Sequence, residues 1–577
     1  MTAAGLVQSV DWLAVAPPAI TAAVALVVLV ADLFLEERRK ALLGALSVAG
    51  LALALLSLLP LRAGHRATFC LTGGVGGPGA GHGGDRLCSY SADHFALVIQ
   101  LLVLGGALLT ALLSMPGRPP AAPREGPADP RTAGGSATGL AAGEAGALPG
   151  EYWFLLLSSA SGAALLPAAR DLATLVVALE VASLPAFALV GLRRGDRLSA
   201  EAALKFFLSS VAATAVMLLG VSFVYAATGT LHLTAIAAQL PHVPGQLQAV
   251  AKTGVLLTLV GFAFKTAAAP FHFWVPDTYV GAPLPIAAYL SVVSKAVGFS
   301  GLILVAVVAF PPYGHLWGPA LAVLAALTMS VGNVAALRQS ATRARGAVRL
   351  LAWSSVAQAG YLLVPIAAAG YAGQRRIGST VAYALMYGAV NLGAFGVVVL
   401  VARTAPLNRL GDYRGLYARR PLAALALAFF LLCLAGLPPG IIGLFAKVTV
   451  FSSAVDAGLG WLALVMAANV VCALYYYLRW TAVLFRPRED AEDRAGERAG
   501  DRPGSTAEDG TDGPVPAGSP AGAEPPGVPG PPAQALPDPV PQTPGPVVAA
   551  VALAAVAGIA LSGAPQLVLR FTDVNLF

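Results

Sequence analysis

Charged residues are scarce in this sequence, and their scarcity indicates the class of the protein. Only 11% of the 577 residues are Asp, Glu, Lys or Arg, whereas 57% are hydrophobic, and the mean hydropathy is +0.74. A soluble globule of this size would need far more polar surface than this composition supplies. We therefore expect the chain to lie in a lipid bilayer.

Cysteine is also rare, and the four cysteines follow no metal-binding spacing. Cys433 and Cys472 lie inside apolar runs, where we interpret them as packing residues. Cys70 and Cys88 share a Gly-rich segment and would form a disulfide only if that segment faces an oxidising compartment, a question that the sequence leaves open. The chain also lacks a G-x-G-x-x-G motif after a strand. We expect no flavin, iron–sulfur cluster, nicotinamide or metal in it.

Long apolar runs, in contrast, recur along the chain. A helix needs about 20 mainly apolar residues to cross a bilayer, so the runs predict an all-α polytopic membrane protein with about fourteen transmembrane helices. The first run lacks a basic segment and a clear cleavage site, which indicates a retained span. The predicted spans are 12–35, 41–61, 92–114, 152–169, 171–192, 201–227, 249–280, 284–310, 315–337, 349–369, 377–402, 421–455, 460–485 and 546–570.

Two segments of different composition divide these spans into groups. Segments 115–150 and 486–545 contain almost nothing large and apolar, so we expect disordered cytoplasmic loops. The groups are 1–114, with three spans and an outward loop at 62–91; 151–310 and 315–485, with five spans each; and 546–577, with the last span and an outward tail.

Basic residues lie mainly in alternate loops, which predicts the orientation. The positive-inside rule places such loops in the cytoplasm, so both termini face outward. The loops concerned carry Arg38, Arg39 and Lys40; Arg193, Arg194 and Arg197; Arg338, Arg343, Arg345 and Arg349; and Arg403, Arg409, Arg414, Arg419 and Arg420. Arg62, Arg66, Arg86, Arg375 and Arg376 lie in the opposite loops and weaken the assignment without reversing it. This distribution accounts for the net charge of +7 without nucleic acid as a partner.

Four charged residues lie deep inside predicted spans: Glu180, Lys265, Lys295 and Lys447. An ionisable side chain near the bilayer centre costs several kcal/mol, so it normally faces the protein interior and marks an ion path. Burial disfavours a charged lysine and a nearby carboxylate favours it, so such a pair can take up and release a proton. The alternative is that each charge is a structural ion pair or a snorkelling side chain.

Two further residues are secondary candidates. Lys205 follows Glu201 by four residues near a helix end, where such a pair needs no function. His272 follows Pro270 at a predicted helix break and titrates in a useful range, although a lone histidine is more often a structural hydrogen-bonding group.

Prolines interrupt two of the predicted spans. Pro270 lies within 249–280, and Pro438 and Pro439 lie within 421–455. Unbonded backbone at membrane depth is tolerated only inside protein or beside a wet cavity. The breaks are five predicted spans apart and each has a lysine nearby, which favours two five-helix repeats in inverted orientation. Ordinary proline kinks are the alternative.

These residues resemble a known family, the antiporter-like membrane subunits of respiratory complex I, which are related to Mrp sodium/proton antiporter subunits. The resemblance covers about residues 90 to 485. It is carried by ALEVASLP, GFAFKTAAAPFHFWVPDTYVGAPLPIAAYLSVVSKAVGF, LAWSSVAQAGYLL, GDYRGLYARRP and LAGLPPGIIGLFAKVTVF. The chain resembles subunit N more than subunit M, because subunit M carries a glutamate at the position of Lys447.

The resemblance implies a role for each buried charge. Glu180 matches the carboxylate of the fifth helix, Lys265 the lysine of a broken seventh helix, Lys295 the central lysine of the eighth, and Lys447 the lysine of a broken twelfth. The family often has a histidine on the tenth helix where this chain has Gln358. Glutamine can order water but cannot carry the charge, so a relay step through a protonated group there is in doubt.

We therefore expect a proton-translocating subunit of a respiratory NADH-quinone oxidoreductase in a bacterial plasma membrane. The resemblance implies that the parent complex uses NADH and quinone, and that subunit M, the small membrane subunits and the lipid bilayer are its partners. One alternative is a sodium/proton antiporter subunit of the Mrp type. Another is a membrane scaffold in which the buried charges only fix helix register.

Overall fold

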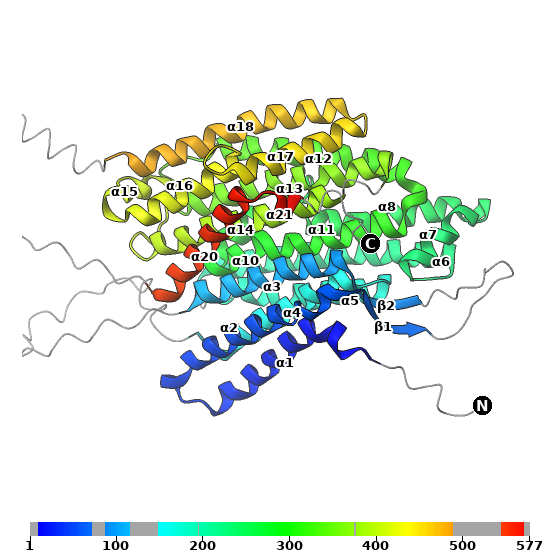
Figure 1. Cartoon of the computed structure of the whole chain (residues 1–577), viewed down its shortest axis with the longest axis horizontal. Helices are drawn as coiled ribbons and strands as arrows, with labels where there is room; N and C mark the ends of the chain where they lie inside the picture. Colours follow the sequence, from blue (N-terminus) through cyan, green and yellow to red (C-terminus); the bar gives the residue numbers. More distant parts are fainter. Residues whose placement is uncertain are drawn as a thin grey trace, which may run out of the picture.

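The computed structural model describes residues 10–71, 87–115, 148–193, 195–373, 377–487 and 544–569. Most of the predicted loops 115–150 and 486–545, and the end of the C-terminal tail, lie outside these ranges. The described part is a bundle of long helices that run nearly parallel to one another (Figure 1).

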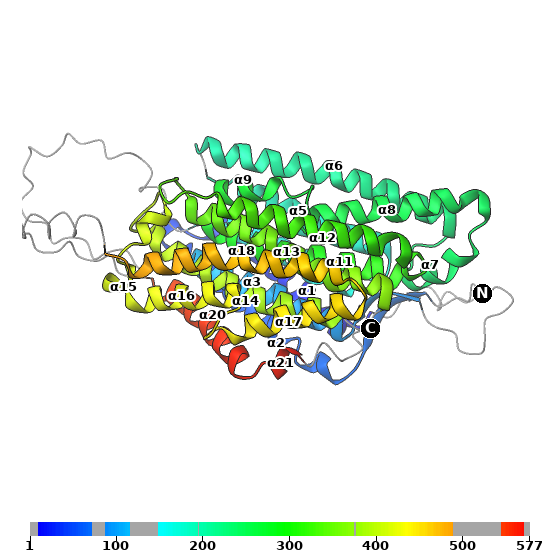
Figure 2. The ribbon, with the colours of Figure 1, turned by 90° about the horizontal axis from the view of Figure 1, so that it is seen from above.

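The first half of the bundle contains α1 (Trp12–Phe34), α2 (Ala41–Leu56), α3 (His94–Ser114), α4 (Gly150–Leu165), α5 (Leu172–Val190), α6 (Arg197–Thr228), α7 (Leu233–Gln239), α8 (Gln248–Lys265), α9 (Trp274–Gly281), α10 (Leu284–Tyr289) and α11 (Lys295–Ile303). Two π-helical segments, Leu290–Ser294 and Leu304–Ala309, flank α11, so residues 284–309 form one rod. In this half α6 and α8 run side by side (Figure 2).

The second half contains α12 (Gly314–Leu337), α13 (Gly346–Ala372), α14 (Ile377–Ala402), α15 (Leu416–Arg419), α16 (Pro421–Ala435), α17 (Ile441–Asp456), α18 (Gly460–Phe485), α20 (Gly545–Gly563) and α21 (Gln566–Leu569). The helices α13 and α14 and the 284–309 rod are almost wholly buried, and they form the centre of the bundle. Their burial explains why apolar residues lie on every face of these three helices.

Aspartates begin four of the membrane helices. The side chains of Asp11, Asp93, Asp171 and Asp196 accept backbone N–H bonds at the starts of α1, α3, α5 and α6. Asp93 also pairs with Arg170, the residue before Asp171, so the starts of α3 and α5 are held together. These caps satisfy N–H groups that a helix start leaves without partners, and they fix where α5 begins.

The predicted loop at 62–91 contains a β-hairpin that the helical pattern did not reveal. Strand β1 (Arg66–Leu71) pairs antiparallel with β2 (Leu87–Ala92) at one end of the bundle (Figure 1). Cys70 and Cys88 face each other across this pair and form a disulfide, which answers the question that the sequence left open. Cys433 is buried, as a packing residue should be, and Cys472 is partly buried.

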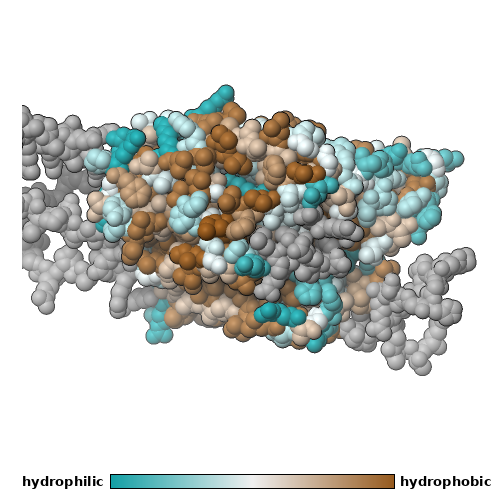
Figure 3. Space-filling model, turned by 45° about the horizontal axis from the view of Figure 1, so that its top comes forward, coloured by the Kyte–Doolittle hydropathy of each residue, from teal (hydrophilic) through white to brown (hydrophobic). Residues whose placement is uncertain are grey.

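Twelve helices in the described part are long and apolar enough to cross a membrane. The two remaining predicted spans consist of shorter helices: α4 has 16 residues, and the span at 421–455 is divided into α16 and α17. Brown, hydrophobic residues cover much of the middle of the face drawn in Figure 3, whereas teal residues gather mainly toward its ends. This distribution suits a protein whose sides face lipid.

Both predicted helix breaks are present. The helix α8 ends at Lys265 and α9 begins at Trp274, so the break contains Pro270. The helix α16 ends at Ala435 and α17 begins at Ile441, so the second break contains Pro438 and Pro439. In both cases a lysine singled out from the sequence lies at or near the interruption.

A glycine allows the start of α17 to pack closely against the end of α16 at the second break, and its replacement should destabilise that break. A Cβ atom on Gly443 would lie 1.8 Å from the carbonyl oxygen of Cys433. We expect Gly443→Ala to cost about 1–3 kcal/mol or more, since a buried backbone group cannot yield easily. The measurement is the thermal stability of the chain in detergent. Gly460→Ala, at a helix start with open space around it, is the control, and equal melting temperatures for both variants would contradict the assignment.

Candidate functional site

Lys265 lies at the end of α8, where the chain leaves the helix. Its side chain is 4% exposed, and Nζ donates a hydrogen bond to Oγ of Ser183 on α5 at 2.6 Å. The ammonium group also lies 5.8 Å from the ring centroid of Phe206, within reach of a cation–π attraction. The break after α8 therefore places a buried cation against the middle of α5.

Glu180 lies one turn before Ser183 on the same face of α5. Its carboxylate attracts the Lys265 ammonium electrostatically, and Oε1 accepts a hydrogen bond from Oγ1 of Thr214 on α6 at 2.8 Å. Unlike the three lysines, Glu180 is only partly buried. The Glu180 carboxylate and the Lys265 ammonium therefore lie within electrostatic reach of each other without forming a salt bridge, and the carboxylate is the more exposed of the two.

Lys295 is the first residue after the π-helical turn at Leu290–Ser294. It is 1% exposed, and Nζ donates to the backbone carbonyl oxygen of Ser355 on α13. π-helical turns are rare and frequently occur at functional sites. His272 packs near Trp353, with ring centroids 5.6 Å apart, and lies within electrostatic reach of Lys295.

Lys447 lies on α17, and its side chain reaches across the second helix break to the end of α16. It is 5% exposed, and Nζ donates to the carbonyl oxygens of Leu434 at 2.9 Å and Ala435 at 2.7 Å. These are among the last carbonyls of α16, which have no partner inside their own helix and carry the negative end of its dipole. The interrupted helix therefore supplies a site for a cation without a carboxylate.

None of the three buried lysines forms a salt bridge with a carboxylate in the described ranges. Their partners are a hydroxyl group and backbone carbonyls, which hold an ammonium group less firmly than a paired carboxylate would. Fixed structural ion pairs would require a carboxylate bonded to each lysine, and no such pair is present in the described ranges. A lysine held by neutral groups is better suited to gain and lose a proton.

Gln358 lies between Lys295 and Lys447 in a network of hydroxyl groups. Its Oε1 accepts from the hydroxyl of Tyr383 at 2.5 Å, and its Nε2 donates to the hydroxyl of Tyr477 at 3.2 Å. The Tyr383 ring stacks on that of Tyr361, and Lys447 Nζ lies 5.8 Å from the Tyr361 ring centroid. At the other end, Ser354, which bonds Tyr477 at 2.5 Å, precedes the Ser355 carbonyl that Lys295 contacts.

The sequence interpretation missed these tyrosines, although a signal was present. Tyr361, Tyr383 and Tyr477 lie in the interior of predicted spans, away from the membrane interfaces where tyrosine is usually enriched. A hydroxyl at that depth needs a hydrogen-bonding partner. Ser183 and Thr214 also escaped notice, because serine and threonine commonly bond their own helix in membranes.

Lys205 does not join the buried residues. As expected, its Nζ pairs with Glu201 at 2.7 Å, and it pairs also with Asp277 of α9 at 3.0 Å. Its side chain is half exposed, and Asp277 is shared with Arg349 of α13 at 3.6 Å. This cluster connects α6, α9 and α13 near the ends of those helices, and it can stabilise their arrangement without carrying ions.

The Ser183 hydroxyl accepts from Lys265 and donates to the carbonyl oxygen of Leu179, so its removal takes away the hydroxyl partner of Lys265. We expect Ser183→Ala to slow proton transfer through Lys265 about ten-fold, because a hydrogen bond to a charged group contributes roughly 1.5–3 kcal/mol. Proton transport by membranes that contain the assembled variant is the measurement. Ser183→Thr keeps the hydroxyl, and Ser222→Ala removes an exposed one from α6. Unchanged transport in Ser183→Ala would show that this bond has no role.

An all-α membrane bundle with lysines buried at two broken helices defines an antiporter-like membrane subunit. The family model described as NADH:quinone oxidoreductase/Mrp antiporter, TM, matches residues 169–472. A curated relative, NADH-quinone oxidoreductase subunit N 2 of Streptomyces griseus, is 66% identical over 575 residues, which is 100% of this chain and 96% of the relative. Subunit N of Salinispora tropica is 43% identical over 83% of this chain and 86% of its own. The chain therefore belongs to the NADH-quinone oxidoreductase subunit N family.

Solved structures agree with this assignment. A chain of respiratory complex I from Thermus thermophilus, determined with bound aureothin, is 31% identical, with a TM-score of 0.64 over 96% of this chain and 98% of that one. A chain of the Mrp complex of a Dietzia species has a TM-score of 0.70 over 97% of this chain and 96% of its own, at 20% identity. The second likeness concerns the fold alone.

Proposed function

We propose that this chain translocates protons across a bacterial plasma membrane as a subunit of NADH-quinone oxidoreductase. The observation that carries the proposal is that three buried lysines are each held by neutral groups, and that hydrogen-bonded polar side chains around Gln358 lie between two of them, Lys295 and Lys447. The names of its relatives supply the parent reaction, in which NADH and quinone react elsewhere in the complex. The chain itself would carry no redox centre, and subunit M, the small membrane subunits and the bilayer would be its partners.

Each buried charge has a proposed task. Glu180 sets the charge state of Lys265, because its negative charge favours the protonated lysine and a change in its influence lets the proton leave. Lys295 passes a proton along the bundle, and Lys447 releases it toward the outer face. Electrostatic coupling between these buried charges is favoured by the low dielectric of their surroundings.

Gln358 limits how a proton could pass between Lys295 and Lys447. The amide cannot hold an extra proton, so the proton would pass along reorienting hydroxyl groups or ordered water and not through a charged residue at that position. Tyr383 and Tyr477, which bond both ends of the amide, are the groups that would reorient. His272, beside Lys295, is a secondary candidate for the same path.

The finer architecture is part of the proposal. We infer fourteen spans, with α4 and the divided α16–α17 segment crossing in addition to the twelve longer helices. The units at 151–310 and 315–485 would be inverted repeats, each with its own broken helix. The basic loops would face the cytoplasm and both termini the outside.

Ion specificity tests the function. Inverted membrane vesicles that contain the complex should take up protons when NADH is supplied, with the same yield in sodium-free and sodium-containing buffer. A proton signal that requires sodium and persists without NADH would support the Mrp-type alternative. If replacing Lys295 with methionine leaves both proton signals unchanged, the result supports the scaffold alternative.

A further inference from the structure

Two buried hydroxyl groups connect the rod that carries Lys295 with the part of α5 that meets Lys265. The hydroxyl of Tyr289 donates to Oγ of Ser159 on α4 at 2.9 Å, and Oγ of Ser159 donates to the backbone carbonyl oxygen of Ala182 on α5 at 2.6 Å. Tyr289 and Ser159 are each only 1% exposed. We call these two consecutive hydrogen bonds the α4 bridge.

Both ends of the α4 bridge lie at the candidate site. Ala182 directly precedes Ser183, whose hydroxyl accepts the hydrogen bond of Lys265. Tyr289 is the last residue of α10 and directly precedes the π-helical turn that ends before Lys295. The bridge therefore ties the hydroxyl partner of one buried lysine to the rod that carries the next.

A proline weakens α5 at the point where the bridge reaches it. Pro185 lies inside α5 and has no backbone N–H, so the carbonyl of Val181, four residues earlier, lacks its usual partner in the helix. The turn that contains Ser183 thus has fewer internal backbone hydrogen bonds than a regular turn. Its position therefore depends more strongly on the helices that pack against it.

The neighbouring helices approach this region at close range. A Cβ atom on Gly162 of α4 would lie 2.4 Å from the backbone nitrogen of Ala182. A Cβ atom on Gly298 of α11 would lie 2.9 Å from the backbone carbonyl carbon of Lys265. Both glycines allow a backbone approach that a larger residue would prevent. Since closely packed interiors transmit strain, a displacement of α4 or of the rod reaches the surroundings of Lys265.

Given the proposed proton-translocating function, on which the inference rests, we propose that Tyr289 and Ser159 are positioning residues for proton transfer at Lys265. The α4 bridge holds the proline-weakened turn of α5 so that the Ser183 hydroxyl meets the ammonium group of Lys265. A hydrogen bond weakens steeply as its angle departs from linear. The bridge therefore acts on the rate of transfer at Lys265 without itself taking up the proton.

The initial rate of NADH-driven proton uptake by inverted vesicles that contain the assembled complex tests the proposal. Tyr289→Phe keeps the ring and removes only the hydroxyl, and Ser159→Ala removes both bonds of the bridge. We expect Tyr289→Phe to lower the rate about five-fold, the effect of one lost hydrogen bond, and Ser159→Ala to lower it at least as much. If Ser159→Ala does not assemble, Tyr289→Phe decides the outcome, because it leaves the bond between Ser159 and Ala182 in place.

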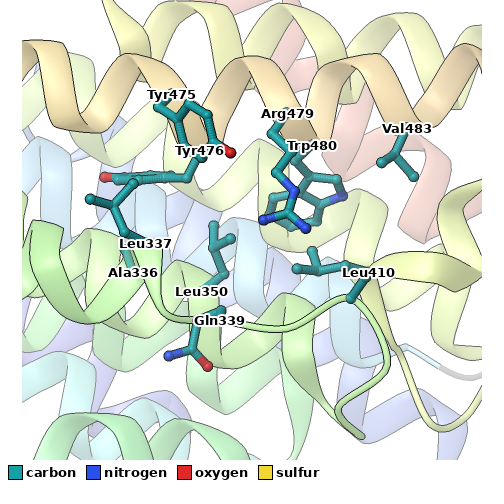
Figure 4. Close-up of a pocket in the computed structure, with 11 residues that line it drawn as sticks. Ala336, Leu337, Gln339, Leu350, Leu410, Tyr475, Tyr476, Arg479, Trp480 and Val483 are labelled. Carbon is teal, nitrogen blue, oxygen red and sulfur yellow. The ribbon is translucent and has the colours of Figure 1, made fainter.

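Two buried hydroxyl groups elsewhere provide matched controls. Tyr413 is buried and its hydroxyl donates to Oδ1 of Asn408 at 2.7 Å. Its ring packs against that of Trp480, which lines a small surface hollow between α12, α13 and α18 (Figure 4). Figure 1 draws α18 along the top of the bundle and α4 near the bottom. Ser47 is buried on α2 and donates within its own helix, which makes it the control for Ser159. Tyr413→Phe and Ser47→Ala should keep the wild-type rate even where thermal stability falls.

A double variant distinguishes positioning from a merely structural role. If the bridge acts through the bond between Ser183 and Lys265, Tyr289→Phe should slow a Ser183→Ala protein no further, whereas independent effects would multiply. A wild-type rate in Tyr289→Phe would overturn the positioning role, and so would a further loss of about five-fold in the double variant. Lys265→Ala is measured alongside. A wild-type rate in Lys265→Ala would overturn the proposed function itself, whereas a defective Lys265→Ala beside a normal Tyr289→Phe would overturn only the role of the bridge.

Discussion

Replacing Lys265 with alanine should abolish the proton translocation that this chain contributes while leaving the complex assembled. Lys265 is the buried cation nearest Glu180, and its bond to Ser183 holds it at the broken end of α8. Alanine offers no group that can carry a proton there. A positioned proton carrier typically contributes a factor of about 10²–10⁴, so transfer should slow by at least about 100-fold.

The measurement is proton uptake per NADH oxidised in inverted vesicles, with assembly checked on native gels. Lys252→Ala is the matched control, because it removes an exposed lysine from the same helix. It should leave the yield at the wild-type value. Wild-type yield in Lys265→Ala would show that Lys265 is not on the path.

Replacing Lys447 with methionine should also stop translocation, and this variant separates a relay from a scaffold. Methionine has a similar length and fills the space without the charge. It leaves the carbonyls of Leu434 and Ala435 without their donor, which costs roughly 1–3 kcal/mol. We therefore expect a modest loss of thermal stability together with a loss of proton transfer of at least about 100-fold.

A scaffold would show the stability loss without the transport loss. Lys447→Arg helps to separate the two, because arginine restores the donors to the carbonyls but does not release its proton in proteins. If Lys447 is a carrier, arginine should recover stability and leave transport defective. Recovery of both would indicate that the charge at this position is structural.

The sequence predicted most of the membrane fold, for a physical reason. A bilayer admits few kinds of spanning structure, so the apolar runs and the prolines that interrupt two of them were enough to place the long helices and both breaks. The strands β1 and β2 were missed because they lie almost wholly outside the apolar runs, where that constraint gives no prediction. The disulfide between Cys70 and Cys88 depends on how these strands pair, and no pattern in the sequence reveals that pairing.

The sequence predicted the candidate site less completely. The three lysines stood out because charge is rare in apolar spans, and the structure places all three in the interior. Their partners could not be predicted, since a backbone carbonyl such as that of Ser355 leaves no trace in residue type. Nor could the sequence show that Glu180 is only partly buried and meets Thr214 of α6, because side-chain burial depends on how the helices pack.

The most direct test of a single connected path is the proton yield of the double variant Lys265→Ala/Lys447→Met in the reconstituted complex. Protons pumped per electron are compared among wild type, both single variants and the double variant. If the two lysines act in series, each single variant loses the whole contribution of this chain, and the double variant loses no more than either. A double variant that loses clearly more than each single variant would contradict the account, because the lysines would then serve separate paths.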